Sequence, residues 1–405
     1  MKKPLEGIKI VEVAMWAFVP AAGGILSDMG ASVLKIEPPD GDPLRALNIG
    51  GITPGEHGFV LSWENYNRGK KSMTLDLRQQ AGVDVLYKLV QSADVFLTNL
   101  LPRARRKMKI DVEHIRALNP NIIYAVGSGT GRLGPEGDKG GYDAISFWAR
   151  GGIAASAPVE GGSDFPVGPP AGAFGDVLSG AMLAGGVAAA VAQRALTGHA
   201  SVVDASLLNT AMWAMQRSIT QATLDGRKTL PSGSRTQTPN PLVNVYRTSD
   251  DRFLSLCMLQ AQRYWATFCE VVERPDLGAD PRFATDADRA VNKIVCIAEL
   301  DALFASKPLA EWREILARQE GQWDVVQQVG ELHEDVQVVA NGYMQVVNYA
   351  DGRTLKMVST PMQFDQVPLP AAPAPELGAD SDQTLADLGY SEDEIIDLKV
   401  AGVVF

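Results

Sequence analysis

The chain has 405 residues, 46% of them hydrophobic, which is enough apolar material for two or three domains or one large interleaved one. Its formal net charge of −11 argues against a general nucleic-acid or membrane-surface role, so an anionic ligand must meet a local basic cluster. The 3 cysteines and 4 histidines stand in no metal-like spacing, which predicts buried, reduced thiols and no metal site.

The beginning of the chain lacks the long apolar core of a signal peptide. The longest uncharged apolar run, residues 180–192, is too short to span a bilayer. We therefore expect a soluble, cytoplasmic protein that binds neither membrane nor nucleic acid.

The N-terminal third alternates short apolar runs with helical stretches. We expect strands within residues 7–15, 31–38, 71–78, 94–100 and 121–131, and helices over residues 20–30, 79–92 and around 112–118. Strands that alternate with helices across short turns indicate a parallel sheet of the doubly wound type. The predicted fold class is α/β, with a Rossmann-like large domain.

Further along, a long helix is predicted from about residue 176 to residue 197, ended by Gly198, and then one more strand within residues 201–208. Residues 225–246 are rich in Gly, Pro, Ser and Thr and predict a linker to a smaller α+β domain. The Asp-Gly pair within residues 349–354 predicts a hairpin, and two short helices follow near the C-terminus.

Two kinds of motif point to a ligand. Residues 129–134, GTGRLG, match a dinucleotide-binding pattern but no helix follows, so a glycine loop that covers some ligand is the better interpretation. Basic clusters stand at residues 103–109 and 67–72. Each alone is usually solvated, but together in an acidic chain they favour a phosphorylated ligand.

Asp176 is an isolated charge in a small, apolar stretch, and three explanations remain open. It could cap the long helix, it could pair with a buried cation that the sequence does not show, or it could be a nucleophile. In the last case the helix N-terminus would keep the carboxylate ionised, and Gly175 would let a substrate approach.

Seven stretches stand in a characteristic order: LEGIKIVEVA to DPLR, NRGKKSMTLDLR, DVFLTNLLP, LNPNIIYAVGSGTGRLGP, GYDAISFWARGG, GDVLSGAMLAGGVAAAVAQRALTG and LGADSDQTLADLGYSEDEIIDLKVAGVV. Together they resemble the class III CoA-transferases (CaiB/BaiF type), which include formyl-CoA transferases and the related α-methylacyl-CoA racemases. The resemblance runs from about residue 5 to residue 404.

The resemblance implies that Asp176 is the nucleophile of an acyl-CoA:carboxylate CoA-transferase. Tyr142, the second catalytic candidate, stands where the racemases have a histidine base. A phenol is a poor base at neutral pH, which favours a transferase over a racemase. A CoA-binding homologue without catalysis is the third alternative.

The resemblance, together with the basic clusters, gives the expected binding residues. Ala17 and Pro38 depart from the oxalate-type members, so we expect a bulky apolar or aromatic acyl group rather than oxalate. The expected CoA contacts are Asn99, Lys107, Arg105, Arg106, Lys71 and Leu75. The expected acyl-pocket residues are Trp16, Ala17, Phe18, Asp143 and Trp148.

Relatives in this family form interlocked homodimers whose large domain is built from both ends of the chain. On that basis the domains are expected at residues 1–225, 226–344 and 345–405, the last returning to the large domain. The expected ligands are an acyl-CoA and a free carboxylic acid, with coenzyme A as cosubstrate and with no metal or permanently bound cofactor.

Overall fold

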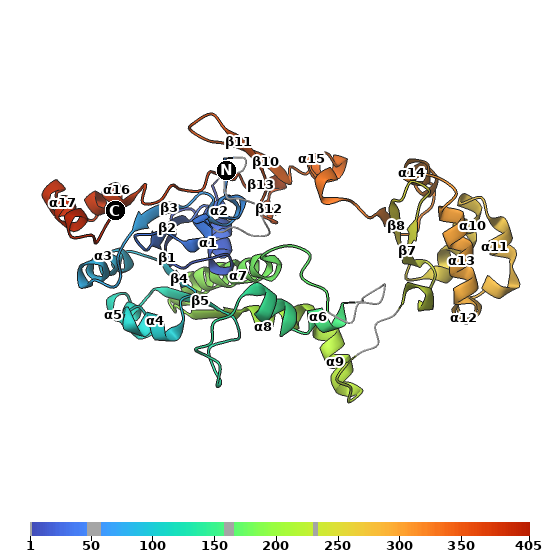
Figure 1. Cartoon of the computed structure of the whole chain (residues 1–405), viewed down its shortest axis with the longest axis horizontal. Coiled ribbons are helices and arrows are strands. Elements are labelled where there is room, and N and C mark those ends of the chain that lie inside the picture. The colour runs from blue at the N-terminus through green and yellow to red at the C-terminus, as the bar shows by residue number, and fades with distance from the viewer. Residues whose placement is uncertain (1, 47–57, 158–165, 230–233) are drawn as a thin grey trace. The chain divides into compact units, whose positions relative to one another are not determined.

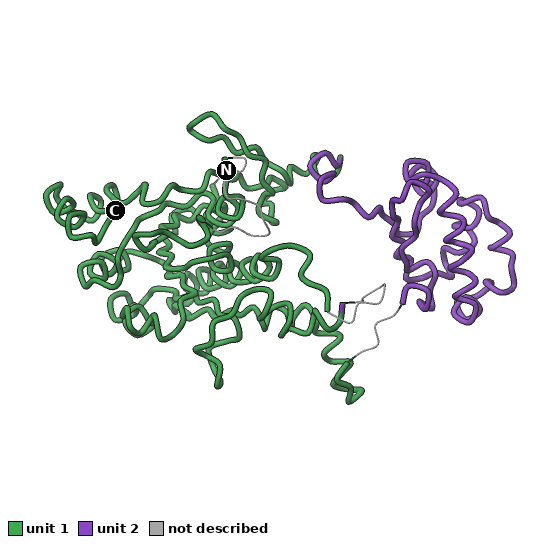
Figure 2. Tube along the Cα trace, in the orientation of Figure 1, with its two compact units in different colours: residues 1–156, 166–229, 336–405 green, residues 157–165, 230–335 purple. Residues whose placement is uncertain are grey.

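A computed structural model describes residues 2–46, 58–157, 166–229 and 234–405 of the chain. Contacts within the chain divide it into two units, coloured separately in Figure 2. Unit 1 holds the described residues up to 156, residues 166–229 and residues 336–405. Unit 2 holds the described residues between 230 and 335, with residue 157.

A six-stranded sheet forms the centre of unit 1, with the strand order β3-β2-β1-β4-β5-β6 (Figure 1). The strands are β1 (Lys9–Val13), β2 (Ser32–Glu37), β3 (Lys71–Thr74), β4 (Val95–Thr98), β5 (Ile123–Ser128) and β6 (Val202–Ser206). Every neighbouring pair is parallel, which confirms the predicted parallel α/β sheet. The chain order reverses between β1 and β4, and ligands bind at the carboxyl edge beside such a reversal.

Helices cover both faces of this sheet. The helices of this part of unit 1 are α1 (Phe18–Asp28), η1 (Pro43–Ala46), α2 (Leu61–Asn67), α3 (Gln80–Gln91), α4 (Pro102–Lys107), α5 (Val112–Leu118), the π-helix η2 (Asp143–Ala149), α6 (Ile153–Ser156), α7 (Phe174–Thr197), α8 (Leu207–Ala214) and α9 (Gln216–Leu224). Successive strand residues point to opposite faces. Ile10 therefore joins a core with α1 and α7, whereas Val11 and Val13 join a core with α3 and α5.

Helix α7 is the longest of these, with 24 residues, and ends at Gly198 as predicted. It packs on α1, where a Cβ at Gly180 would lie 2.8 Å from the Phe18 carbonyl oxygen. By length and composition alone α7 would suffice to cross a bilayer, because the helix extends beyond the run counted in the sequence. Its buried residues, which include Leu183 and Val187, instead belong to the core of unit 1.

The C-terminal segment joins the β3 edge of the sheet. It contains α15 (Val336–Ala340), β10 (Met344–Asn348), β11 (Thr354–Val358), β12 (Gln363–Phe364), β13 (Val367–Pro368), α16 (Ser381–Asp387) and α17 (Glu392–Val400). Strands β10 and β11 pair antiparallel, which confirms the predicted hairpin. The Ser72 N–H donates to Asp380, and the Thr74 hydroxyl donates to the Phe405 carbonyl.

Unit 2 packs helices on a small antiparallel sheet of β7 (Val243–Arg247), β8 (Phe253–Cys257) and β9 (Trp323–Val325). Its helices are η3 (Arg235–Gln237), α10 (Ala261–Val271), α11 (Pro275–Ala279), η4 (Pro281–Phe283), α12 (Asp286–Val291), α13 (Lys293–Phe304), α14 (Leu309–Leu316) and η5 (Val329–Glu331). Strand β7 begins inside the predicted linker, of which residues 230–233 lie outside the described residues.

The cysteines of unit 2 correct one expectation. Cys269 and Cys296 are buried, but Cys257 is exposed, since it ends β8 with its side chain turned away from the core. The prediction of uniformly buried thiols is therefore wrong for Cys257.

Candidate active site

A cavity of about 240 Å³ lies at the carboxyl edge of the sheet in unit 1, and we call it the reaction cavity. It is bordered by the turns that follow β1, β4 and β5, by residues 132–142 and by the first turn of α7. Six of the predicted site residues line it: Trp16, Phe18, Asn99, Arg105, Tyr142 and Asp176. Because these residues come from four different segments, the sheet edge is what brings them together.

Asp176 lies in the first turn of α7 but does not cap it. The N-cap residue is Ala173, which has a left-handed backbone and no capping side chain. No described residue donates a hydrogen bond to the Asp176 carboxylate. Burial, and then the charge of Asp143, raise the pKa of Asp176 to about 7. The expectation that the helix terminus keeps this carboxylate cheaply ionised is therefore wrong, because burial and a like charge outweigh it.

Asp143 performs the capping role instead. It is buried at the start of η2, and its Oδ1 accepts a hydrogen bond of 2.9 Å from the Gly175 N–H. A Cβ at Gly175 would collide with this carboxylate and with the Phe147 ring, so only glycine fits there. Asp143 was expected in the acyl pocket, but the cap turns it away from the reaction cavity, which it does not line.

Trp16 and Tyr142 form an aromatic pair at the reaction cavity. Their rings meet edge to face, with centroids 5.7 Å apart, and Tyr142 is 58% exposed. Asn99 holds the turn before Trp16: its Oδ1 accepts from the Met15 N–H at 3.0 Å, and its Nδ2 donates to the Met15 carbonyl at 2.6 Å. The amide predicted to contact CoA is thus already bonded to the turn.

Arg105 lines the reaction cavity, but its guanidinium is paired with Asp111. The side chain is buried, donates to the Leu100 carbonyl at 2.7 Å and pairs with Asp111 at 3.2 Å. A guanidinium paired in this way mainly fixes the chain after β4. Its contribution to an anionic ligand is correspondingly reduced.

The other predicted cations lie outside the reaction cavity. Arg106 pairs with Asp138 on the surface, and Lys107 is exposed at the end of α4. Lys71 starts β3, so it lies at the opposite end of that strand from the carboxyl edge. Because β3 runs parallel to its neighbour, the residues that follow β3, and not Lys71, lie at the carboxyl edge of the sheet.

Leu75, which follows β3, lines a second hollow of about 200 Å³ beside the reaction cavity. The two share Met15 and Leu100 as lining residues. Arg78 also lines the second hollow and is paired with Asp76 at 2.7 Å. The two hollows therefore adjoin each other at Met15 and Leu100.

Two cations of the reaction cavity were not among the predicted site residues. Arg132 and Lys139 line it from the glycine-rich loop after β5. Each makes only a partly exposed ion pair, Arg132 with Asp204 at 3.6 Å and Lys139 with Glu136 at 3.2 Å. The sequence does carry a signal for them: basic residues stand within and just after the glycine-rich motif at residues 129–134, which itself predicts a ligand.

Two predicted pocket residues do not line the reaction cavity. Ala17 is buried at the start of α1, and the Trp148 indole is turned away to donate to the Val167 carbonyl at 2.6 Å. Among the described residues, no group of three or more His, Cys, Asp and Glu side chains could hold a metal ion.

The comparisons with known proteins agree on one family. The chain matches the model of CoA-transferase family III over residues 5–381. It is 32% identical over 402 residues to (R)-2-hydroxy-4-methylpentanoate CoA-transferase of Clostridioides difficile, covering 99% of each chain. It is 31% identical over 400 residues to cinnamoyl-CoA:phenyllactate CoA-transferase of Clostridium sporogenes, covering 97% of this chain and 95% of the relative.

A solved structure gives the same result. The crystal structure of a CaiB/BaiF family protein from Brucella suis aligns with a TM-score of 0.80 at 25% identity, covering 96% of this chain and 100% of the other. The chain therefore belongs to CoA-transferase family III and is a CoA-transferase.

Proposed function

We propose that this enzyme moves CoA between two carboxylic acids through covalent intermediates on Asp176. The observation that carries the proposal is the state of this carboxylate. It lines the reaction cavity, and no described residue donates a hydrogen bond to it. A carboxylate with no protein partner is available to attack an electrophile.

The chemistry proceeds by two matched half-reactions. The Asp176 carboxylate attacks the donor thioester carbonyl, the C–S bond breaks, and a mixed anhydride and CoA thiolate result. The thiolate then attacks the aspartyl carbonyl, which releases the donor acid and leaves an aspartyl-CoA thioester. The acceptor carboxylate repeats these steps in reverse, and splitting the exchange in this way replaces one difficult step by easier ones.

Ionisation of Asp176 controls the first step, because only the carboxylate is nucleophilic. With its pKa raised to about 7 by burial and by Asp143, a substantial part of the free enzyme holds this group protonated at neutral pH. The Gly175 N–H is already bonded to Asp143, so it does not serve as an oxyanion donor.

In this proposal CoA extends from the reaction cavity into the second hollow. Its nucleotide end would lie against Leu75 and Arg78, and its thioester beside Asp176. Arg132 and Lys139 would meet phosphate groups, for which partly exposed cations are well suited.

The acyl group is proposed to be bulky and apolar or aromatic. Trp16, Phe18, Tyr142 and Leu207 give the reaction cavity apolar walls. The names of two relatives specify a cinnamoyl group in one case and a branched hydroxy acid in the other. A racemase would need a strong base beside the substrate, but no histidine is among the described residues that line this cavity.

We also propose a homodimer, as the family resemblance implies. Unit 1 exposes apolar side chains along η2, α7 and α8 that the described residues leave uncovered: Ile145, Phe174, Val177, Leu178, Met182, Met212 and Trp213. Faces of this kind on soluble proteins commonly mark protein contacts. Light scattering coupled to gel filtration should give twice the chain mass, and a monomer would contradict this part of the proposal.

Trapping of the intermediate tests the proposed function. With acyl-CoA present and no acceptor acid, hydroxylamine should convert Asp176 to a hydroxamate, and borohydride should inactivate the enzyme only after acyl-CoA is added. Asp176→Ala should give no adduct and no transfer. A label on Asp143 would still indicate a CoA-transferase but would contradict Asp176 as the nucleophile. The absence of any label would indicate a racemase or a CoA-binding homologue without catalysis.

A further inference from the structure

The turn between β1 and α1 carries backbone strain at the reaction cavity. Trp16 has a φ of 69°, in the left-handed region that normally favours glycine, although its side chain is among the largest. Such a conformation persists only where the surroundings determine it. The Trp16 ring lines the reaction cavity and meets Tyr142, so whatever holds this backbone also sets the shape of the site.

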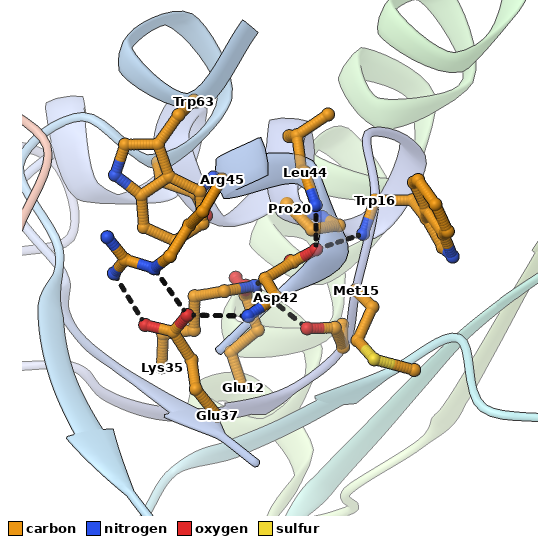
Figure 3. A network of polar contacts seen from close by, with 12 residues as sticks. Glu12, Met15, Trp16, Pro20, Lys35, Glu37, Asp42, Leu44, Arg45 and Trp63 are labelled. Atoms are coloured by element: carbon orange, nitrogen blue, oxygen red, sulfur yellow. Dashed lines mark hydrogen bonds and ion pairs between the residues drawn. The ribbon is translucent and has the colours of Figure 1, made fainter. Parts of the chain in front are cut away.

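Asp42 holds the strained residue directly. Its Oδ1 accepts from the Trp16 N–H at 3.1 Å and from the Leu44 N–H at 3.0 Å, while its Oδ2 pairs with the Lys35 Nζ at 3.0 Å (Figure 3). Asp42 is 1% exposed, so its carboxylate is shielded from water. The carboxylate thus joins a buried cation on one side to the cavity wall on the other.

Lys35 fixes the position of the Asp42 side chain. It is fully buried in β2, pairs with Glu12 at 3.2 Å and donates to the Ala14 carbonyl at 2.8 Å. Burial alone would lower the pKa of Lys35, but the charges of Glu12, Asp42 and Glu37 outweigh it and hold the pKa above its usual value. The lysine therefore stays charged.

The remaining members of this network pair with Glu12 and Glu37 and do not contact Trp16. Lys70 pairs with Glu12 at 2.9 Å, and Arg45 pairs with Glu37 at 2.8 Å while its guanidinium stacks 3.6 Å from the Trp63 ring centroid. With Lys35 and Asp42, the network holds three acidic and three basic groups. Buried ion pairs add little to stability compared with apolar packing, and their better attested use is to fix one conformation.

We propose that Asp42 is a positioning residue that holds the Trp16 ring at the reaction cavity through its hydrogen bond to the Trp16 N–H, and thereby sets the selectivity for the acyl group. This inference rests on the proposed function of the Asp176 site. Asp42 does not line the reaction cavity itself, so it acts only through Trp16.

Two substitutions separate positioning from charge balance. Asp42→Glu keeps the charge beside Lys35 but moves the acceptor by about the length of one methylene. Asp42→Asn keeps an acceptor at Oδ1 but removes the charge. If Asp42 positions Trp16, Asp42→Glu should lower kcat/KM for cinnamoyl-CoA about tenfold to hundredfold, and much less for acetyl-CoA, because a misplacement near 1 Å costs about that much. Asp42→Asn should keep the selectivity close to wild type.

A purely electrostatic role predicts the opposite ranking, with Asp42→Asn the more damaging of the two. Arg45→Gln is the matched control, since it opens the same network away from Trp16 and should leave the selectivity unchanged. In a double-mutant cycle, Asp42→Glu should cause no further loss in a Trp16→Ala background. Additive losses, or equal losses for both acyl-CoAs, would overturn the inference.

A spectroscopic readout keeps this test independent of the proposed function. In protein labelled with 5-fluorotryptophan, the Trp16 fluorine signal is assigned by its absence in Trp16→Phe. It should shift or broaden in Asp42→Glu and stay in place in Asp42→Asn and Arg45→Gln. An unmoved Trp16 signal in folded Asp42→Glu would overturn the role of Asp42, whereas a wild-type enzyme without CoA transfer would overturn the proposed function and leave this signal informative.

Discussion

The two walls of the reaction cavity are held in opposite ways. The turn wall, formed by Met15 and Trp16, is fixed by partly buried hydrogen bonds with Asn99 and with the buried Asp42 carboxylate. The loop wall, residues 129–141, is held by ion pairs on the surface, among them Arg106 with Asp138 at 3.2 Å, both more than half exposed. Exposed pairs contribute little to stability, whereas a buried bond is costly to break.

This difference suggests that the two walls have different roles, one in the reaction and the other in binding. The turn wall and Asp176 would face the reacting carbonyl, where small displacements cost rate. The loop wall carries Arg132 and Lys139, which would face a long and flexible ligand, and a loop that adjusts at low cost suits that task. Changes near the turn wall should therefore act on chemistry, and changes in the loop wall on binding.

Among residues that do not themselves react, the largest effect is expected at Gly175, which ties Asp143 to the first turn of α7. Gly175→Ala forces a Cβ into the Asp143 carboxylate and the Phe147 ring. Transfer should fall about a hundredfold or more, because Asp176 is the next residue. The free energy of unfolding should fall by about 1–3 kcal/mol.

Gly185→Ala on the same helix is the matched control for Gly175→Ala. An added Cβ there meets nothing within 4 Å, so the free energy of unfolding should stay equal or rise by about 0.5–1 kcal/mol. Urea unfolding and initial transfer rates measure both effects. Equal activity in the two variants would contradict the role of Gly175.

A smaller effect is expected in the loop wall. Arg132→Ala and Lys139→Ala should each raise KM for acyl-CoA by about threefold to tenfold with kcat nearly unchanged, because phosphate contacts are equal in the ground and transition states. The increase should shrink at high salt. Lys107→Ala is the matched comparison: Lys107 is exposed and lines neither hollow. If KM rose more in Lys107→Ala than in the two loop variants, the phosphate groups would bind at α4 instead of at the loop wall.

A change in pH dependence is expected at Asp143. The acid limb of kcat/KM for acyl-CoA should lie near pH 7, because the pKa of Asp176 is about 7 and the carboxylate is the reactive form. Asp143→Asn keeps an acceptor for the Gly175 N–H but removes the negative charge, so the limb should move to lower pH. The midpoint of the acid limb should still stay well above 3.8, the usual pKa of an aspartate, because burial raises the pKa of Asp176 more than the charge of Asp143 does. If the acid limb did not move in Asp143→Asn, it would report the ionisation of a group other than Asp176.

Local patterns predicted most of the sheet and several helices. Residues 112–118 were expected to be helical, and α5 spans Val112–Leu118; residues 349–354 were expected to turn, and β10 and β11 flank them. Each of these elements carries its own signal: an amphipathic run, a short apolar run or a turn dipeptide. The helix α4 was missed because its basic residues indicated a solvated cluster rather than a first turn opened by Pro102.

The site was harder to predict because its decisive contacts are long-range. Asp143 reaches Gly175 across 32 residues, and Asp42 reaches Trp16 across 26. No local pattern records either bond. The sequence could indicate Asp176 as a candidate, but the sign of its pKa shift depends on burial and on a second carboxylate that only the fold brings near.

The smallest effect is expected on the free energy of unfolding. Asp176 and Asp76, which lines the second hollow, should change it with pH in opposite directions. Because the pKa of Asp176 is about 7 in the folded state and near 3.8 unfolded, the unfolded state loses its proton first, and Asp176 makes stability fall as pH rises from about 3.8 to 7. Asp176→Asn should remove this loss and raise the free energy of unfolding at pH 7.5 by on the order of 1 kcal/mol.

Asp76 should behave in the opposite way. Its hydrogen bond with Arg78 lowers the pKa of Asp76 to about 2, so it stabilises the fold above about pH 3.8 and this contribution is lost as pH falls toward 2. Asp76→Asn should therefore lower stability at pH 7.5. Chemical unfolding of both variants at pH 5 and pH 7.5 checks the signs. If Asp176→Asn were less stable than wild type at pH 7.5, the Asp176 carboxylate would have a stabilising partner in the folded enzyme, and its availability as a nucleophile would have to be reconsidered.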